Sequence, residues 1–205
     1  MRPMDKWQII SIAALAVIAA PVFAADDTTN GTLTYRGFTV EMSAVQNAWN
    51  LAAIDSSVKH QIDIVADCGA KPEILAFFRS RLITLDPKIF GDGGRFNENG
   101  VAISSSPESP EKPILLHEFL HAYHAQVMPM GVQNPDILLY YNRARNYQLY
   151  PANEYLLTNQ KEFFAVTASL YLWGHVSREP FTRDKLKAQQ PIYYAWLGRQ
   201  FGVQK

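Results

Sequence analysis

His117-Glu118-Phe119-Leu120-His121-Ala122-Tyr123-His124 holds three of the five histidines of this 205-residue chain, and its first five residues have the pattern H-E-x-x-H. On an α-helix, residues four apart lie on one face, a turn apart. Two imidazoles so placed can bind one Zn²⁺, and the glutamate between them can act on water. The composition gives this pattern by chance about 0.005 times. We therefore interpret it as a zinc site, the alternative being a surface helix with two ordinary histidines.

The N-terminus has the layout of a secretory signal peptide covering residues 1–24. Arg2 and Lys6 precede an apolar run over 9–20, and small residues lead to a cleavage point before Ala25. The apolar run is shorter than the 20 or so residues of a membrane span, although an uncleaved N-terminal anchor is the alternative. We predict an exported protein, periplasmic or secreted, that is not stably inserted in a membrane once the signal is removed.

Residues 25–205 have the length of one domain with a sizeable core. Without the signal segment, 17 Lys and Arg residues stand against 18 Asp and Glu residues, a formal charge of −1. This balance argues against nucleic acid and anionic membrane as partners, and nothing in it fixes an oligomeric state. The single cysteine, Cys68, cannot form an internal disulfide and is expected to be a buried apolar side chain.

Apolar spacing and turn residues predict an α+β domain with a small sheet in its N-terminal half. Strands are expected at 33–40, divided by Gly37, at 81–85 and at 101–105, and a hairpin is expected around Arg95-Phe96. The second half should be mostly helical. Helices are expected over 43–52, 56–69, 72–78, from 111–114 to 128, and over 136–149, 160–173, 183–189 and 192–201.

A catalytic zinc site needs more than two histidines, because such sites usually have three protein ligands and one open position. The longer pattern H-E-x-x-H-x-x-G-x-x-H is excluded, because Val127 stands where its last histidine would be. His124 lies one further turn along the same face, where three ligands would form a line that suits a tetrahedron poorly. We expect His124 either to support the site or face the substrate, or to be an ordinary packed histidine.

A carboxylate from a second helix is the remaining source of a third ligand. Glu162 lies in the first turn of a helix whose other residues are largely apolar. A carboxylate beside an apolar surface needs a partner, and a metal ion is a suitable one. The alternative is a glutamate that faces water and is favoured there by the helix dipole.

Two segments together resemble a known family. H-E-F-L-H at 117–121 and Y-L-L-T-N-Q-K-E-F-F-A at 155–165 are similar to the catalytic domain of anthrax lethal factor and to the related secreted Pro-Pro endopeptidases. The resemblance implies a zincin-like metallopeptidase fold, in which the H-E-x-x-H helix is packed against a second helix that carries the third zinc ligand. It implies one Zn²⁺ per chain held by His117, His121 and Glu162, with Glu118 as the general base and Tyr155 as an assisting hydroxyl.

The resulting hypothesis is an exported zinc endopeptidase with a protein or peptide substrate. An extended substrate could pair with the strand 101–105 as an added strand. Two alternatives come from other functional classes: an inactive zinc-binding envelope protein that recognises a protein partner, and a purely structural secreted domain. Glu118 argues against the first alternative, because a scaffold site has no need of that base.

Overall fold

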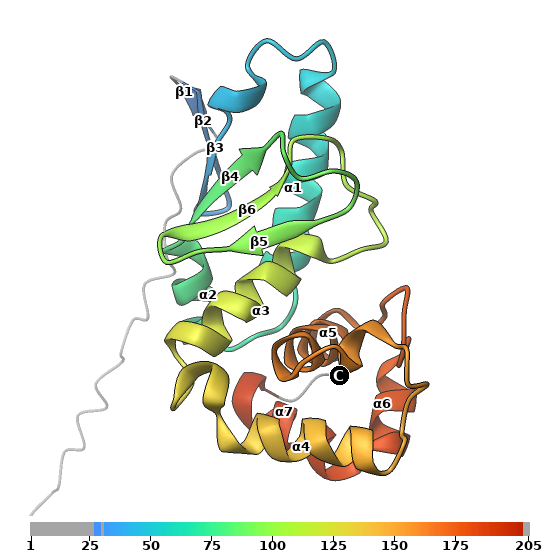
Figure 1. Cartoon of the computed structure of the whole chain (residues 1–205). Helices are drawn as coiled ribbons and strands as arrows, with labels where there is room; N and C mark the ends of the chain where they lie inside the picture. The colour runs from blue at the N-terminus through green and yellow to red at the C-terminus, as the bar shows by residue number, and fades with distance from the viewer. Residues whose placement is uncertain (1–26, 30, 203–205) are drawn as a thin grey trace, which may run out of the picture.

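The computed structural model describes residues 27–29 and 31–202, so the predicted signal peptide lies outside the described residues. Within this part, the chain forms a mixed sheet and seven α-helices, as the predicted α+β class requires. The sheet lies in one half of the molecule and the helices α4 to α7 in the other, with α3 between them (Figure 1). Among the described residues, no helix has the length and apolar character needed to cross a membrane.

The sheet has six strands in the order β1-β2-β3-β4-β6-β5. The central strands β3, β4 and β6 are parallel, and the outer pairs β1–β2, β2–β3 and β5–β6 are antiparallel. Strand β5 therefore forms one edge of the sheet. The strands are β1 (Asp27–Thr29), β2 (Thr32–Tyr35), β3 (Phe38–Glu41), β4 (Leu82–Asp86), β5 (Gly94–Phe96) and β6 (Gly100–Ser104).

The helices follow the sequence prediction closely in the second half of the chain. Three short 3-10 turns, η1 (Ser43–Val45), η2 (Gly131–Gln133) and η3 (Tyr155–Leu157), separate some of them. The α-helices are α1 (Leu51–Ala66), α2 (Pro72–Arg79), α3 (Ile114–Gln126), α4 (Pro135–Asn146), α5 (Gln160–Trp173), α6 (Arg183–Gln189) and α7 (Pro191–Phe201).

The predicted helix over 43–52 was wrong. The chain makes only the turn η1 there, held by bonds such as Val45 N–H to the Met42 carbonyl (3.0 Å), and one helix, α1, then begins at Leu51. The apolar spacing suggested a buried face that includes Trp49, yet this side chain is 97% exposed. A helical face is stabilised only where tertiary contacts bury it, and here they bury Val45 and part of Ala48 but leave Trp49 in solvent.

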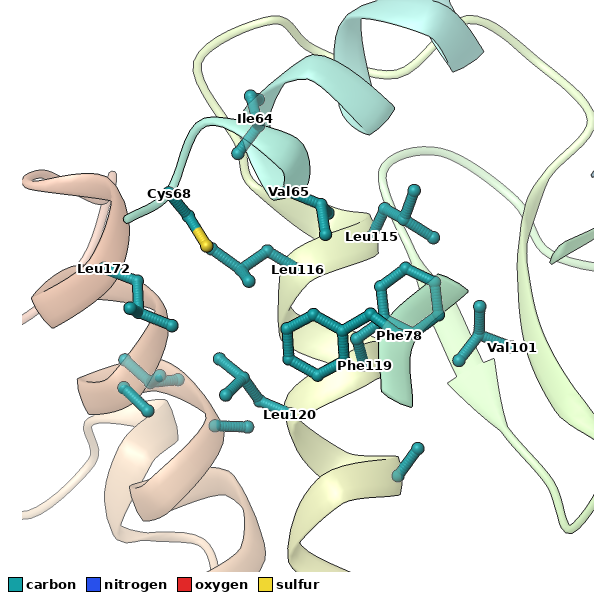
Figure 2. Close-up of a cluster of buried hydrophobic side chains, with 14 of the residues drawn as sticks. Ile64, Val65, Cys68, Phe78, Val101, Leu115, Leu116, Phe119, Leu120 and Leu172 are labelled. Carbon is teal, nitrogen blue, oxygen red and sulfur yellow. The ribbon is translucent and has the colours of Figure 1, made fainter. Parts of the chain in front are cut away.

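The core on either side of α3 fixes the position of the H-E-x-x-H segment. Phe119 stacks on Phe78 of α2 at 5.1 Å between ring centroids, while Leu116 and Leu120 lie toward α5 and Leu172 (Figure 2). All five side chains are almost completely buried. Burial of each such side chain contributes about 1.5–3 kcal/mol. The apolar residues of α3 thus hold the helix between sheet and α5, which leaves His117 and His121 on its remaining face.

The first turn of α3 is held by a buried side chain from α1. The Gln61 amide donates to the Lys112 carbonyl (2.8 Å) and accepts from the Leu115 N–H (3.1 Å). Gln61 is fully buried, so both of its polar ends are satisfied by backbone groups rather than by water. Two long-range hydrogen bonds therefore fix the start of the helix three residues before His117.

Candidate metal centre

His117 and His121 lie one turn apart on α3 and direct their Nε2 atoms to the same point. These two atoms are 3.0 Å apart. The Phe96 ring from β5 stacks on the His121 imidazole, with 5.9 Å between centroids and 17° between planes. Sheet and helix together therefore restrict the orientation of His121.

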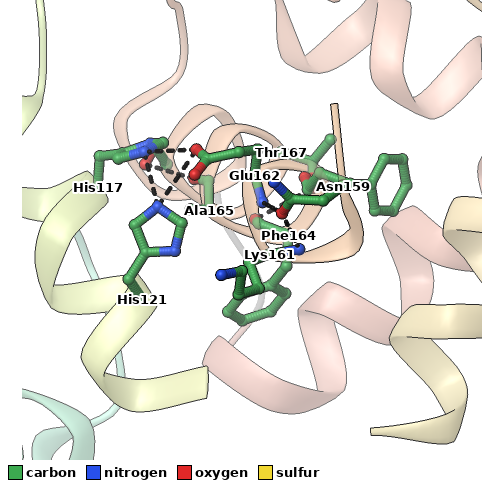
Figure 3. Close-up of polar contacts among 10 residues, drawn as sticks. His117, His121, Asn159, Lys161, Glu162, Phe164, Ala165 and Thr167 are labelled. Carbon is green, nitrogen blue, oxygen red and sulfur yellow. Dashed lines mark hydrogen bonds and ion pairs between the residues drawn. The ribbon is translucent and has the colours of Figure 1, made fainter. Parts of the chain in front are cut away.

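Glu162 reaches the same point from the first turn of α5. The Asn159 side chain caps this helix by accepting from the N–H groups of Lys161 (2.9 Å) and Glu162 (3.1 Å). The Oε2 atom of Glu162 lies 3.2 Å from Nε2 of His117 and 3.3 Å from Nε2 of His121 (Figure 3). Its side chain is only 17% exposed. The carboxylate thus faces the histidines rather than water.

The three atoms have the spacing of a zinc site. Zinc lies about 2.0–2.1 Å from histidine nitrogen and carboxylate oxygen in tetrahedral sites, which places neighbouring ligand atoms about 3.3 Å apart. The three separations here are 3.0, 3.2 and 3.3 Å. Among the described residues, His117, His121 and Glu162 are the group of His, Cys, Asp and Glu side chains that could hold a metal ion. The donor set and its geometry fit zinc.

The protonation states also suit a metal. Burial lowers the pKa of His117, which favours the neutral imidazole that a metal requires. Burial alone would raise the pKa of Glu162, but the hydrogen bonds from His117 and His121 outweigh it and hold that pKa below its usual range. The site therefore offers a neutral imidazole at His117 and an ionised carboxylate at Glu162.

Glu118 lies beside this centre, under the edge strand of the sheet. Burial raises the pKa of its carboxyl group to about 8, and the negative charges of Glu162 and Glu108 add to the shift. Gly94 on β5 makes room for it. A Cβ atom at residue 94 would lie 2.4 Å from Cγ of Glu118 and 2.9 Å from the Ala102 carbonyl oxygen, too close for either contact. Because there is no space for a side chain here, this position of the strand requires a glycine.

Tyr155, in the turn η3, lies on the α5 side of the same cleft as His117 and Glu118. Its side chain is 43% exposed. Burial raises the pKa of Tyr155 to about 12, and the hydrogen-bonded carboxylate of Glu162 adds to the shift. The hydroxyl is therefore protonated at neutral pH and can donate a hydrogen bond.

His124 takes no part in this centre. It is fully buried against the Phe164 ring, at 4.9 Å between centroids, and neither ring nitrogen has a hydrogen-bond partner among the described residues. Burial lowers its pKa to about 4, with the charges of His121 and Lys161 contributing. Of the roles left open by the sequence, the structure supports the packed histidine.

The centre opens into a cleft of about 350 Å³ between the sheet and the helical half. The strand prediction for substrate pairing was wrong, because β6 (Gly100–Ser104) pairs with β4 on one side and β5 on the other. The free edge near the cleft belongs to β5. Gly94 and Arg178 also line the cleft, although neither residue belongs to a motif in the sequence. Only a three-dimensional fold brings them near His117.

Comparison with known proteins gives a structural match. No family model and no curated protein matches the sequence. The structure is similar to that of the Pro-Pro endopeptidase PPEP-2 from Paenibacillus alvei, with a TM-score of 0.51 and 19% identity. The match covers 75% of this chain and 94% of the other. The two proteins share a fold. The likeness to anthrax lethal factor stays a prediction.

Proposed function

We propose that this protein is an exported zinc-dependent endopeptidase. The observation that carries the proposal is the convergence of His117, His121 and Glu162 at tetrahedral spacing, beside Glu118 and an open cleft. The shared fold with an endopeptidase supports it. Zinc, when bound, supplies a Lewis acid that activates water and polarises a carbonyl oxygen.

Two further side chains of the cleft, Glu118 and Tyr155, support the proposal. The Glu118 carboxylate accepts the proton of the attacking water and delivers it to the leaving amine. Its raised pKa helps the carboxyl group hold the proton until it is delivered, and a bound Zn²⁺ would favour the ionised form that must accept the proton first. The Tyr155 hydroxyl donates a hydrogen bond to the carbonyl oxygen as negative charge develops there.

An extended substrate fits along the edge strand β5. This strand is paired with β6 on one side only, and Gly94 lines the cleft. Backbone N–H and C=O groups at a sheet edge can pair with an added peptide strand regardless of its side chains. Such pairing would bring a peptide bond past Glu118, which lies directly under Gly94.

The direct test is Glu118→Gln. We expect this variant to bind one zinc ion per chain with the affinity of the wild-type protein and to lose peptide cleavage, measured on a blocked peptide library with and without a chelator. Unchanged cleavage would exclude Glu118 as the base. Stoichiometric zinc in the wild-type protein without any turnover would favour the inactive zinc-binding protein instead.

Export is tested separately, because residues 1–24 lie outside the described structure. Expression of the whole chain in a bacterial host, followed by N-terminal sequencing of the exported fraction, should give Ala25 as the first residue. A protein that keeps Met1 and sediments with the membranes would support the uncleaved anchor.

A further inference from the structure

A cation without a carboxylate partner lies in the cleft beside the proposed catalytic hydroxyl. Arg178 is exposed, and its guanidinium carbon lies 4.5 Å from the centre of the Tyr155 ring. It lines the cleft together with His117 and Glu118. A peptide bound across the centre would therefore lie in the same cleft as the Arg178 charge.

The loop over 174–182, between α5 and α6, fixes the backbone of Arg178. The Phe181 N–H donates to the Arg178 carbonyl (2.8 Å), and the Val176 N–H donates to the Phe181 carbonyl (3.0 Å). An antiparallel bridge between His175 and Thr182 closes the base of the loop. Contact with the Tyr155 ring restricts the side chain as well.

The charges of the cleft leave Arg178 unbalanced. Lys112, the other lysine or arginine in its lining, is paired with Asp92 at 2.7 Å. Within the described part of the chain, no carboxylate lies at ion-pair distance from Arg178, and neighbouring Glu179 is paired with Lys185. A bound Zn²⁺ would balance Glu118 and Glu162, so the cleft of the zinc-loaded protein keeps one positive charge.

We propose that Arg178 binds a carboxylate of the substrate and thereby makes the protein select peptides that carry a carboxylate near the cleaved bond. The proposal rests on the proposed endopeptidase function and names its substrate class. A guanidinium that lies over an aromatic ring uses its face for that contact and keeps its in-plane N–H groups free. Those donors match the two oxygens of a carboxylate, supplied by an Asp or Glu side chain or by the C-terminus of a peptide.

The test compares two matched pairs of fluorescent peptide mixtures with the zinc-loaded protein. In the first pair both ends are blocked, the central positions are randomised without acidic residues, and one position is fixed as Glu or as Gln. In the second pair no acidic side chain is present, and the C-terminus is free or amidated.

Arg178→Met removes the charge and keeps an unbranched side chain. Arg143→Met is the control, since Arg143 also lies over a tyrosine ring (Tyr147, 5.7 Å) but outside this cleft.

In one of the two pairs, we expect the mixture that carries the carboxylate to be cleaved with about a tenfold higher kcat/KM than its neutral partner. This preference should weaken as the salt concentration rises, because salt screens the charges. Arg178→Met should abolish this preference, so that the acidic mixture and its neutral partner are cleaved with equal kcat/KM, while Arg143→Met should keep it. The peptide pair that shows the preference identifies the carboxylate. Equal cleavage of acidic and neutral peptides would overturn the proposal. So would an equal loss on both from Arg178→Met, which would assign Arg178 to the positioning of Tyr155.

A binding measurement separates this proposal from the proposed function. The same peptides are titrated into zinc-loaded Glu118→Gln protein and followed by fluorescence anisotropy. Absence of any cleavage by the wild-type protein would refute the peptidase. In that case the carboxylate site would still be supported if an acidic peptide binds more tightly than its neutral partner and if Arg178→Met removes this difference. Equal binding of acidic and neutral peptides in that case would refute both.

Discussion

Replacement of Gly94 by alanine should disable the centre through Glu118 while leaving zinc in place. The added Cβ would lie 2.4 Å from Cγ of Glu118 and 2.9 Å from its Cδ, where ordinary contacts are at least 3.4 Å. Either the edge strand or the Glu118 side chain must move by about 1 Å. Misplacement of a reacting group by that distance costs about 100-fold in rate, and overpacking costs about 1–3 kcal/mol.

The assays are peptide cleavage, zinc stoichiometry and thermal unfolding. We expect kcat to fall about 100-fold with one zinc per chain retained, and Tm to fall by about 2–4 °C for each kcal/mol lost. Gly93→Ala is the matched control. Its new methyl group would meet only the Ile89 side chain, at 3.3 Å, and that side chain can adjust.

A double-mutant cycle with Glu118→Ala tests the cause. This substitution removes the two Glu118 atoms that the new methyl group would meet, so Gly94→Ala should destabilise the Glu118→Ala background less than it destabilises the wild-type protein. An equal loss in both backgrounds would refute the reasoning. The clash with the Ala102 carbonyl would then account for the whole effect, and Gly94 would have no special relation to Glu118.

Three further predictions concern the ligand, the hydroxyl and the helix start. Glu162→Gln should weaken zinc binding by at least about 100-fold, measured by competition with a chelator, and unchanged affinity would remove Glu162 from the ligand set. Tyr155→Phe should lower kcat about 100-fold with zinc retained; an unaltered kcat would exclude the hydroxyl from the mechanism. Gln61→Leu should cost about 1–3 kcal/mol in urea unfolding, because it leaves the Leu115 N–H and the Lys112 carbonyl unpaired, and no change would show that water replaces Gln61.

The sequence predicted the parts of the fold that depend on neighbours along the chain. Helices in the second half, the strands around Gly37 and the hairpin that holds Arg95 all follow from local spacing and turn residues. The helix expected from Ser43 failed, because Trp49 is exposed and the apolar residues there are not gathered on a buried helical face. The spacing of apolar residues predicts a helix correctly only where tertiary contacts bury the face that the spacing defines.

The same distinction separates the residues of the site. The H-E-x-x-H spacing by itself determines that His117 and His121 share a helical face, because the pitch of a helix is a local property. Glu162 was a candidate from its position at a helix start, but only the packing of α3 against α5 brings its carboxylate within 3.3 Å of both histidines. Backbone geometry fixes the first relation, whereas burial of apolar side chains on α3 fixes the second.

Gly94 and Arg178 belong entirely to the tertiary structure. Nothing in the sequence near either residue marks it, since a glycine in a turn-rich segment and an arginine in a loop are ordinary features. The order of the sheet puts β5 at the edge above Glu118, and the loop after α5 returns to place Arg178 over Tyr155. Contacts between residues far apart along the chain depend on how whole elements stack, which the spacing of residues within one element does not specify.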